Sequence, residues 1–284
     1  MGAEYDATNI FTPILSIITS ISLEHTSYLG RSISEVALQK AGIIKREVPV
    51  IIPNSLGEDA LNVIREQASY YEAPVLTSSH YHMAMLLNDG FSFIYQDKGE
   101  LKISIRSEYS LLNAMFALDA VYLLEEKFPI STYAVKKGLL ETKLPGRTTI
   151  INKKPLIIID GAHNPEAMRK ISTDFEKIAQ NGNIHAVFAC FRDKNIELML
   201  SSLDTLASDI TLTTFDHKRA RNDEDYFLYL EEYPYEEDHH KAIQDLINKY
   251  PDDVVLITGS LAFAMLVEKE FEREEYTFEN PQSI

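Results

Sequence analysis

An acid and a histidine share one short turn in the second half of the chain. Asp160 and His163 follow the apolar run PLIIID at residues 155–160 and are separated by a glycine and an alanine. In open α/β sheets ligands bind outside the carboxyl ends of the strands, so we expect both side chains to leave the core there. Asn164 can cap the next helix and Pro165 suits its first position. A plain strand–turn–helix connection explains these two residues and the glycine. It does not explain the acid and the histidine, which we interpret as ligand-binding candidates.

Glu24 and His25 form a second acid–histidine pair, which follows the apolar run ILSIITSIS at residues 14–22. Carboxylate and neutral imidazole are both metal ligands, although Mg²⁺ prefers oxygen to nitrogen. A single pair of this kind is more often an ordinary surface pair. A further acid, Asp6, opens the segment DATN shortly before the same run. The first part of the chain therefore holds a second candidate site.

Two basic residues lie in segments that also have simple structural explanations. Lys40 belongs to QKAGIIK near the end of an expected helix, where a lysine favours the helix dipole. Arg147 ends LPGR, which is either a hinge turn or, at an interdomain crevice, a planar cation that suits phosphate. The acidic run Glu231–His240 contains two histidines but lacks the ligand spacing of a known metal site, so we interpret it as a solvated loop.

These candidates need strands and helices that position them. In the first half, short β-branched runs alternate with helical periodicity, which predicts a parallel sheet with helices on both faces. The expected elements are strands at residues 14–22, 49–53 and 74–79 and helices at residues 34–45 and 57–72. Ser34 is the expected N-cap of the first helix. Two turns that end in glycine then predict an antiparallel meander over residues 82–106, followed by helices at 110–127 and 131–141.

A second series of strands and helices begins after LPGR. The expected elements are strands at residues 155–160, 185–190, 209–215 and 254–259 and helices at residues 165–180, 195–207 and 238–249. We expect an α/β protein with two domains. Residues 1–146 carry a mostly parallel sheet plus the antiparallel meander, and residues 147–284 form a Rossmann-like α/β domain.

The composition limits the classes of partner. The chain has 27 Lys and Arg against 43 Asp and Glu, a formal charge of −16, which disfavours binding to a nucleic-acid backbone. No apolar run reaches the roughly 18 residues that span a bilayer, and no secretory signal opens the chain. The single cysteine, Cys190, excludes an intrachain disulfide and fits a reducing compartment. We expect a cytoplasmic protein that binds neither nucleic acid nor membrane.

Taken together, the motifs resemble one family in order and spacing, the folylpolyglutamate and dihydrofolate synthases of the Mur-ligase-like group. The resemblance runs from residue 2 to about residue 265, through the segments DATNIFTP, SITSISLEHTSYLG, QKAGIIK, LLNA, LPGR, DGAHNPEAM, FRDKN, KRA and ITGSL. It implies a truncated Mur-ligase central domain that lacks its P-loop part, followed by a Rossmann-like ligase domain. It also implies a monomer.

The resemblance implies a reaction and a set of site residues. Such ligases use ATP to convert a carboxylate into an acyl phosphate, which the amine of L-glutamate then attacks; the acceptor is a folate, or dihydropteroate is joined to glutamate. By position, His25 matches a Mg²⁺ ligand, Lys40 a lysine carbamylated in the group, and Asp6 a contact to the pterin substrate. The positions that contact ATP in the family correspond to Asn113, Arg147, Asp160 and His163. Lys194 and Ser260 match motifs to which we assign no role.

The chain also departs from the family pattern. It contains no G-x-x-x-x-G-K-S/T segment, the P-loop whose backbone amides hold phosphates, and Gln39 stands where the family has glutamate. We therefore expect the 284 residues to be the C-terminal part of a ligase and to be inactive alone. The alternative is a truncated non-catalytic relative that acts as a binding or interaction module. A Mur-type ligase with a different acceptor is a weaker alternative, because DATN and DGAHNP occur together.

Overall fold

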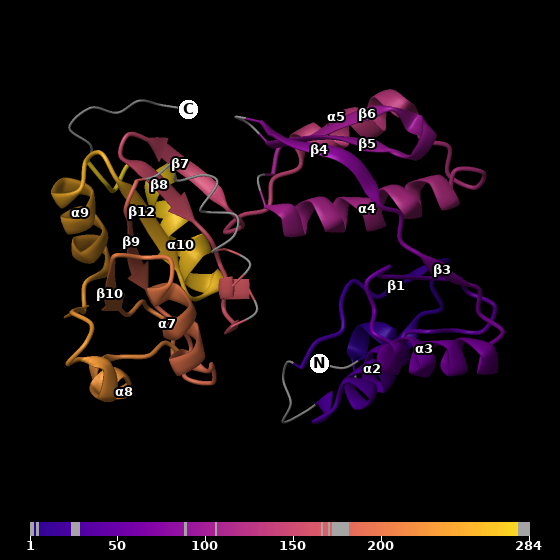
Figure 1. Cartoon of the computed structure of the whole chain (residues 1–284), viewed down its shortest axis with the longest axis horizontal. Helices are drawn as coiled ribbons and strands as arrows, with labels where there is room; N and C mark the ends of the chain where they lie inside the picture. The colour runs from indigo at the N-terminus through magenta and orange to yellow at the C-terminus, as the bar shows by residue number, and fades with distance from the viewer. Residues whose placement is uncertain are drawn as a thin grey trace. The chain divides into compact units, whose positions relative to one another are not determined.

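The computed structural model describes residue 3 and residues 6–23, 29–87, 90–105, 107–165, 167–169, 171 and 182–277. The chain folds into two compact units (Figure 1). The first comprises Met1–Ile103 and Ser110–Glu141, and the second comprises Ser104–Tyr109 and Thr142–Ile284. Residues 142–146, which the sequence analysis placed in the first domain, group with the second unit. One reason is that the Gly146 amide donates to the Glu268 carboxylate over 2.6 Å.

A three-stranded parallel sheet opens the first unit. Its strands are β1 (Ser16–Ile17), β2 (Val50–Ile52) and β3 (Val75–Thr77), in that order, with helices α2 (Ile33–Ala41) and α3 (Glu58–Tyr70) between them. Val50 and Ile52 share one buried cluster with Ala41 of α2 and with Ile64 of α3. Both helices thus pack on one face, and the predicted two-sided cover is wrong here. Right-handed crossovers between strands in consecutive order place both helices on the same side.

The details of α2 and β1 differ from the prediction. Ser32, and not Ser34, is the N-cap of α2: its hydroxyl accepts from the Glu35 amide, and the Glu35 carboxylate accepts from the Ser32 amide. This is a capping box, which satisfies two amides at the helix start. The strand expected at residues 14–22 pairs only at Ser16 and Ile17, with one more amide bond from Ile18 to the Ile51 carbonyl.

The predicted antiparallel meander is confirmed, as a separate sheet. It consists of β4 (Tyr81–Leu87), β5 (Gly90–Tyr95) and β6 (Glu100–Ile103), followed by α4 (Glu108–Leu123) and α5 (Thr132–Glu141). Asp119 of α4 accepts hydrogen bonds from the Tyr95 hydroxyl over 2.7 Å and from the Ser79 amide over 2.8 Å. One carboxylate therefore ties α4 to both the meander and the segment that leaves β3.

The second unit is built on a six-stranded sheet in the order β11-β10-β9-β12-β8-β7. The strands are β7 (Thr149–Lys153), β8 (Leu156–Ile159), β9 (Ile184–Phe188), β10 (Asp209–Thr213), β11 (Tyr235–Glu236) and β12 (Val254–Thr258). All pairs are parallel except β7 with β8. The sheet is doubly wound, as predicted: Ile158 faces one buried cluster, and Ile157 and Ile159 face the other.

Helices cover both faces of this sheet. They are α7 (Ile196–Asp204) on one face, α9 (His239–Lys249) and α10 (Leu261–Glu272) on the other, and the short α8 (Asp223–Tyr226). The sequence analysis missed β7, β11 and α10. It was also wrong about Glu231–His240, because this run contains β11 and the first residues of α9. Among the described residues, no helix combines the length and apolarity needed to cross a bilayer.

Candidate functional site

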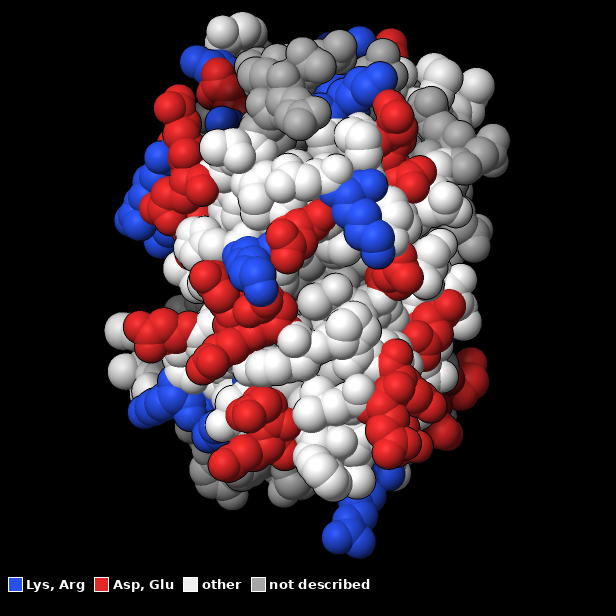
Figure 2. Space-filling view, turned by 90° about the vertical axis from the view of Figure 1, so that its left-hand side faces the viewer, with Lys and Arg blue, Asp and Glu red and all other residues white. Residues whose placement is uncertain are grey.

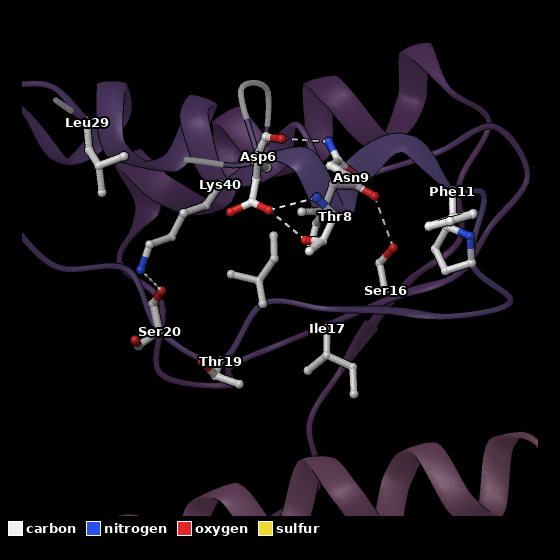
Figure 3. A pocket seen from close by; sticks show the side chains of 14 residues that line it. Asp6, Thr8, Asn9, Phe11, Ser16, Ile17, Thr19, Ser20, Leu29 and Lys40 are labelled. Atoms are coloured by element: carbon white, nitrogen blue, oxygen red, sulfur yellow. Dashed lines mark hydrogen bonds between the residues drawn. The ribbon is translucent and has the colours of Figure 1, made fainter. Parts of the chain in front are cut away.

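A pocket of about 470 Å³ lies in the first unit, beside the 3₁₀ turn η1 (Ala7–Ile10), the segment that follows β1, and α2. Its walls mix apolar side chains such as Ile17 and Leu29 with the polar side chains of Asp6, Ser20 and Lys40 (Figure 3). Ligand pockets in proteins commonly have about this volume and this mixture of many apolar and a few polar groups. The pocket therefore has the size and lining for a small organic ligand.

Asp6 is held in place by the turn that it begins. Its carboxylate accepts hydrogen bonds from the Thr8 hydroxyl over 2.6 Å and from the Thr8 amide over 2.9 Å (Figure 3). These bonds hold the pKa of Asp6 below its usual value because they favour the ionised form. The pocket wall thus presents a fixed negative charge.

Lys40 lies in the last turn of α2 and reaches across the pocket. Its Nζ donates to the Ser20 carbonyl over 2.8 Å (Figure 3). A carbonyl oxygen is a suitable partner for an ammonium group but would repel an anionic carbamate. Carbamylation of Lys40 would therefore require that this contact be replaced.

Asn9 and Ser16 fix the wall between η1 and the end of α2. The Asn9 side-chain amide donates to the carbonyls of Ala3 and Gly42 over 2.8 and 2.9 Å. The Ser16 hydroxyl donates to the Ile43 carbonyl over 3.0 Å. The sequence analysis did not single out either residue, although Asn9 belongs to the DATN motif.

The remaining candidates of the first unit lie elsewhere. His25 and Glu24 fall outside the described residues. Asn113 is half-buried in α4, whereas the described pocket lining comes from η1, β1 and α2 with their flanking segments. Among the predicted residues that are described, the first unit therefore brings only Asp6 and Lys40 together.

In the second unit, Asp160 is buried, with 6% of the residue exposed. Its carboxylate accepts from the Thr148 amide and hydroxyl, both over 2.8 Å, and from the Ala162 amide over 2.9 Å. The expectation that this side chain leaves the core is wrong, because three donors keep it inside. Burial raises the pKa of Asp160, while the bonds from Thr148 and the nearby charge of Arg147 act in the opposite direction. Asp160 therefore positions Thr148, and with it the adjacent Arg147.

Two glycines allow LPGR and the turn after β8 to meet. The Gly161 amide donates to the Gly146 carbonyl over 2.6 Å. A Cβ atom on Gly161 would lie 2.7 Å from Leu261 Cα, so no larger residue fits there. Gly146 has a φ of +68°, which glycine adopts without strain. The start of α10 packs against both loops as a result.

His163 and Asn164 complete this turn. His163 Nδ1 lies 2.9 Å from the Gly161 carbonyl, which only accepts, so Nδ1 is the donor in this contact. The Asn164 side chain accepts from the Ala167 amide over 2.7 Å, which confirms the predicted helix cap. Arg147 and His163 are both half-buried. The second unit therefore gathers three predicted residues, Arg147, Asp160 and His163, around one turn.

Arg221 is a further residue that the sequence analysis missed. Its guanidinium donates to the carbonyls of Arg192 and Lys194 over 3.0 and 3.3 Å and to that of Asp225 over 3.1 Å. It thereby joins the segments FRDKN and KRAR, which follow β9 and β10. The KRA motif was the available signal, but only the fold shows that Arg221 holds a loop rather than facing a ligand.

Residues 146–261 match the family of the Mur ligase glutamate ligase domain. The chain is 32% identical over 283 residues to the dihydrofolate synthase/folylpolyglutamate synthase of Bacillus subtilis, covering 95% of this chain and 65% of that protein. Its structure is similar to an FPGS–AMPPCP complex, with a TM-score of 0.79 at 27% identity over 96% of this chain and 65% of that one. It is also similar to Escherichia coli FolC in complex with ADP, with a TM-score of 0.81 at 25% identity over 97% and 66%. The chain thus spans just under two thirds of the length of these relatives.

Proposed function

We propose that this chain, a relative of the dihydrofolate and folylpolyglutamate synthases, works within an ATP-dependent ligase that joins L-glutamate to a folate or to dihydropteroate. In this reaction the γ-phosphoryl group of ATP moves to a substrate carboxylate, giving an acyl phosphate and ADP. The glutamate nitrogen then attacks the carbonyl carbon, an amide bond forms, and phosphate leaves. Relatives in complex with AMPPCP and with ADP support a nucleotide as the partner.

The observation that carries the proposal is the link from Asp160 to Thr148 in the second unit. It fixes the backbone next to Arg147, an always-charged planar cation that suits phosphate oxygens. His163 lies on the same turn, where its Nδ1 contacts the Gly161 carbonyl. In this proposal Arg147 and His163 contact the nucleotide, whereas Asp160 acts through Thr148 as a positioning residue. Asn113 is proposed as a further nucleotide contact, on its match to the family alone.

The pocket of the first unit is the proposed place for the pterin end of the substrate. A pterin ring carries a donor-rich amino-pyrimidine edge that an ionised carboxylate such as Asp6 can accept from. The apolar walls suit the flat faces of the ring. The volume of about 470 Å³ is adequate for a ring system of this size.

Lys40 and His25 remain the proposed Mg²⁺ ligands. Mg²⁺, when bound, would neutralise phosphate charge. An ammonium group cannot bind a cation, so Lys40 fits this role only as a carbamate, released from its bond to Ser20. Incubation with ¹³C-labelled bicarbonate and ¹³C NMR would show the carbamate in the wild type and lose it in Lys40→Arg. A spectrum that is the same for both proteins would exclude Lys40.

Nucleotide binding tests the proposal on the chain itself. Titration calorimetry should detect ADP, and Arg147→Ala should weaken the affinity at least about tenfold, or 1.4 kcal/mol. Arg46→Ala is the matched control, because Arg46 is an exposed arginine that pairs with Glu72 in the first unit. Equal ADP affinity in the wild type and in Arg147→Ala would contradict the proposed role of the second unit.

A further inference from the structure

Two histidines and two glutamates meet where α9 begins and α10 ends. His239 Nε2 lies 3.0 Å from Glu270 Oε1, and His240 Nε2 lies 3.4 Å from the same oxygen. Ligand atoms from these three residues lie within 4.8 Å of one another. Glu275 Oε2 follows at 3.7 Å from His240 Nε2. The cluster thus combines nitrogen and oxygen ligands from separate elements.

We propose that His239, His240 and Glu270, with Glu275 as the fourth ligand, bind a divalent transition-metal ion of the Zn²⁺ type. Zinc binds imidazole nitrogen and carboxylate oxygen at about 2.0–2.2 Å in tetrahedral sites, which places neighbouring ligand atoms roughly 3.3–3.5 Å apart. The observed separations of 3.0, 3.4 and 3.7 Å bracket that value. Each of these three nitrogen–oxygen pairs thus lies close to the spacing of neighbouring ligands in a tetrahedral site.

The burial of the cluster favours a bound cation. The Glu270 side chain is 6% exposed and that of His239 is 15% exposed. Burying a carboxylate is costly unless a cation or hydrogen-bond donors compensate for its lost hydration. The Tyr276 hydroxyl donates to the other Glu270 oxygen over 2.9 Å, as outer-shell partners of metal ligands do.

The surrounding charge would attract a cation. Figure 2 shows acidic side chains spread over the side of the molecule on which α9 lies in Figure 1. The acidic residue Asp238 is the N-cap of α9 and directly precedes His239. Nearby Lys241 is engaged with Glu236, and Arg273 lies 3.7 Å from a Glu275 oxygen. Local acidity of this kind raises the local concentration of cations.

The ligand types make the site selective. Two imidazole nitrogens suit Zn²⁺, Co²⁺ or Ni²⁺, whereas Mg²⁺ prefers oxygen ligands. This site is therefore distinct in chemistry from the Mg²⁺ proposed for ligation, and it does not depend on that proposal. A bound ion would link the start of α9 to the end of α10 and to the following turn, and would stabilise the second unit.

Zinc titration of the metal-free chain in excess Mg²⁺ tests the proposal. Calorimetry should show one Zn²⁺ per chain, and Co²⁺ in its place should give the visible absorption of a tetrahedral ion. His240→Gln and His239→Gln should each weaken Zn²⁺ binding by at least about tenfold, since even outer-shell losses cost that much. His82→Gln, on the exposed side of β4, should bind Zn²⁺ like the wild type.

His240 is the preferred position because its side chain is already 38% exposed, so its loss should leave the fold intact. Thermal unfolding in a chelator should give the same midpoint for the wild type and for His240→Gln. Should that midpoint fall, Glu275→Gln provides the second variant, since Glu275 is also partly exposed. Zinc affinity that is unchanged in these variants, or Zn²⁺ that excess Mg²⁺ displaces, would overturn the proposal.

Discussion

At the residue scale, a single carboxylate organises the proposed nucleotide site. Asp160 is buried and receives three hydrogen bonds, two of them from Thr148 on the preceding segment. Its loss would leave the amides of Thr148 and Ala162 without an acceptor inside the protein. Buried unsatisfied donors cost about 1–3 kcal/mol each. Asp160 therefore contributes both to stability and to the position of Arg147.

Asp160→Ala should consequently lower both stability and function. We expect the free energy of unfolding to fall by roughly 2–4 kcal/mol, because the acceptor of three hydrogen bonds is removed. ADP affinity should fall as well. Asp160→Asn keeps the shape and one acceptor, so it should cost less. Urea unfolding and ADP titration on the same preparations measure both effects. Weaker ADP binding by Asp160→Ala at unchanged stability would mean that Asp160 contacts the ligand directly.

Sequence alone identified Asp160 and His163 but not the partner that explains Asp160. Thr148 stands 12 residues earlier, at a position that contacts Asp160 only because β7 pairs antiparallel with β8. The run TIINK of β7 is short and half polar, so it lacks the apolar signal of the neighbouring strands. The sequence could thus single out Asp160 by its residue type, whereas its burial depended on a strand that was not predicted.

At the element scale, the amino ends of β9, β10 and β12 are joined by one imidazole. His185 Nδ1 lies 2.9 Å from Asp209 and Nε2 lies 3.1 Å from Asp253, while the ring stacks on Tyr250. A carboxylate can only accept, so a ring nitrogen must carry a proton in order to bond to Asp209 or to Asp253. The Tyr250 hydroxyl and His185 lower the pKa of Asp209, and the bond from His185 lowers that of Asp253.

This arrangement should make the free energy of unfolding depend on pH in the acidic range. A carboxyl group whose pKa is lower in the folded state stabilises the fold at pH values above its unfolded-state pKa of about 3.9. This stabilisation is lost as the pH falls through the folded-state pKa. Asp253→Asn should therefore cost about 1 kcal/mol at pH 7 and progressively less below about pH 4. Urea midpoints of the two proteins across this range provide the measurement. A difference that stays constant down to the lowest pH would show that Asp253 acts through packing alone.

Two glycines give a matched test of how α10 meets the β8 turn. Gly161→Ala would place Cβ 2.7 Å from the Leu261 backbone, so we expect a loss of about 1–3 kcal/mol. Gly138→Ala in α5 meets no atom within 4 Å and should add about 0.5–1 kcal/mol, since alanine favours a helix. Thermal midpoints should shift in opposite directions. Shifts of the same sign would contradict the close contact at Gly161.

The elements with one strong pattern were the ones that sequence could predict. β2, β9 and β12 are fully buried strands in which aliphatic residues predominate, and α9 alternates buried and exposed residues at helical spacing. β11 was missed because it consists of two residues within an acidic run, where backbone pairing with β10 decides the structure. The end of the helix after Pro165 and the segment at His25 lie outside the described residues, so those predictions stay untested.

At the scale of the whole molecule, each of the two units carries one of the proposed sites. The first unit offers the pocket with Asp6 and Lys40, and the second offers the turn with Arg147, Asp160 and His163. The family resemblance predicted which segments carry these residues. The 284 residues contain no P-loop segment, and the chain spans 65% of the length of its Bacillus subtilis relative.

The measurement that tests this account most directly is glutamate ligation. The chain would be assayed alone and fused downstream of the P-loop third of a relative, with ATP, Mg²⁺, labelled L-glutamate and either a folate or dihydropteroate. We predict no turnover by the chain alone and turnover by the fusion. In the Arg147→Ala fusion we expect kcat/KM for ATP to fall roughly a hundredfold or more, a loss of about 2–4 kcal/mol of transition-state stabilisation. A folded fusion without turnover, or one in which Arg147→Ala changes nothing, would contradict the account.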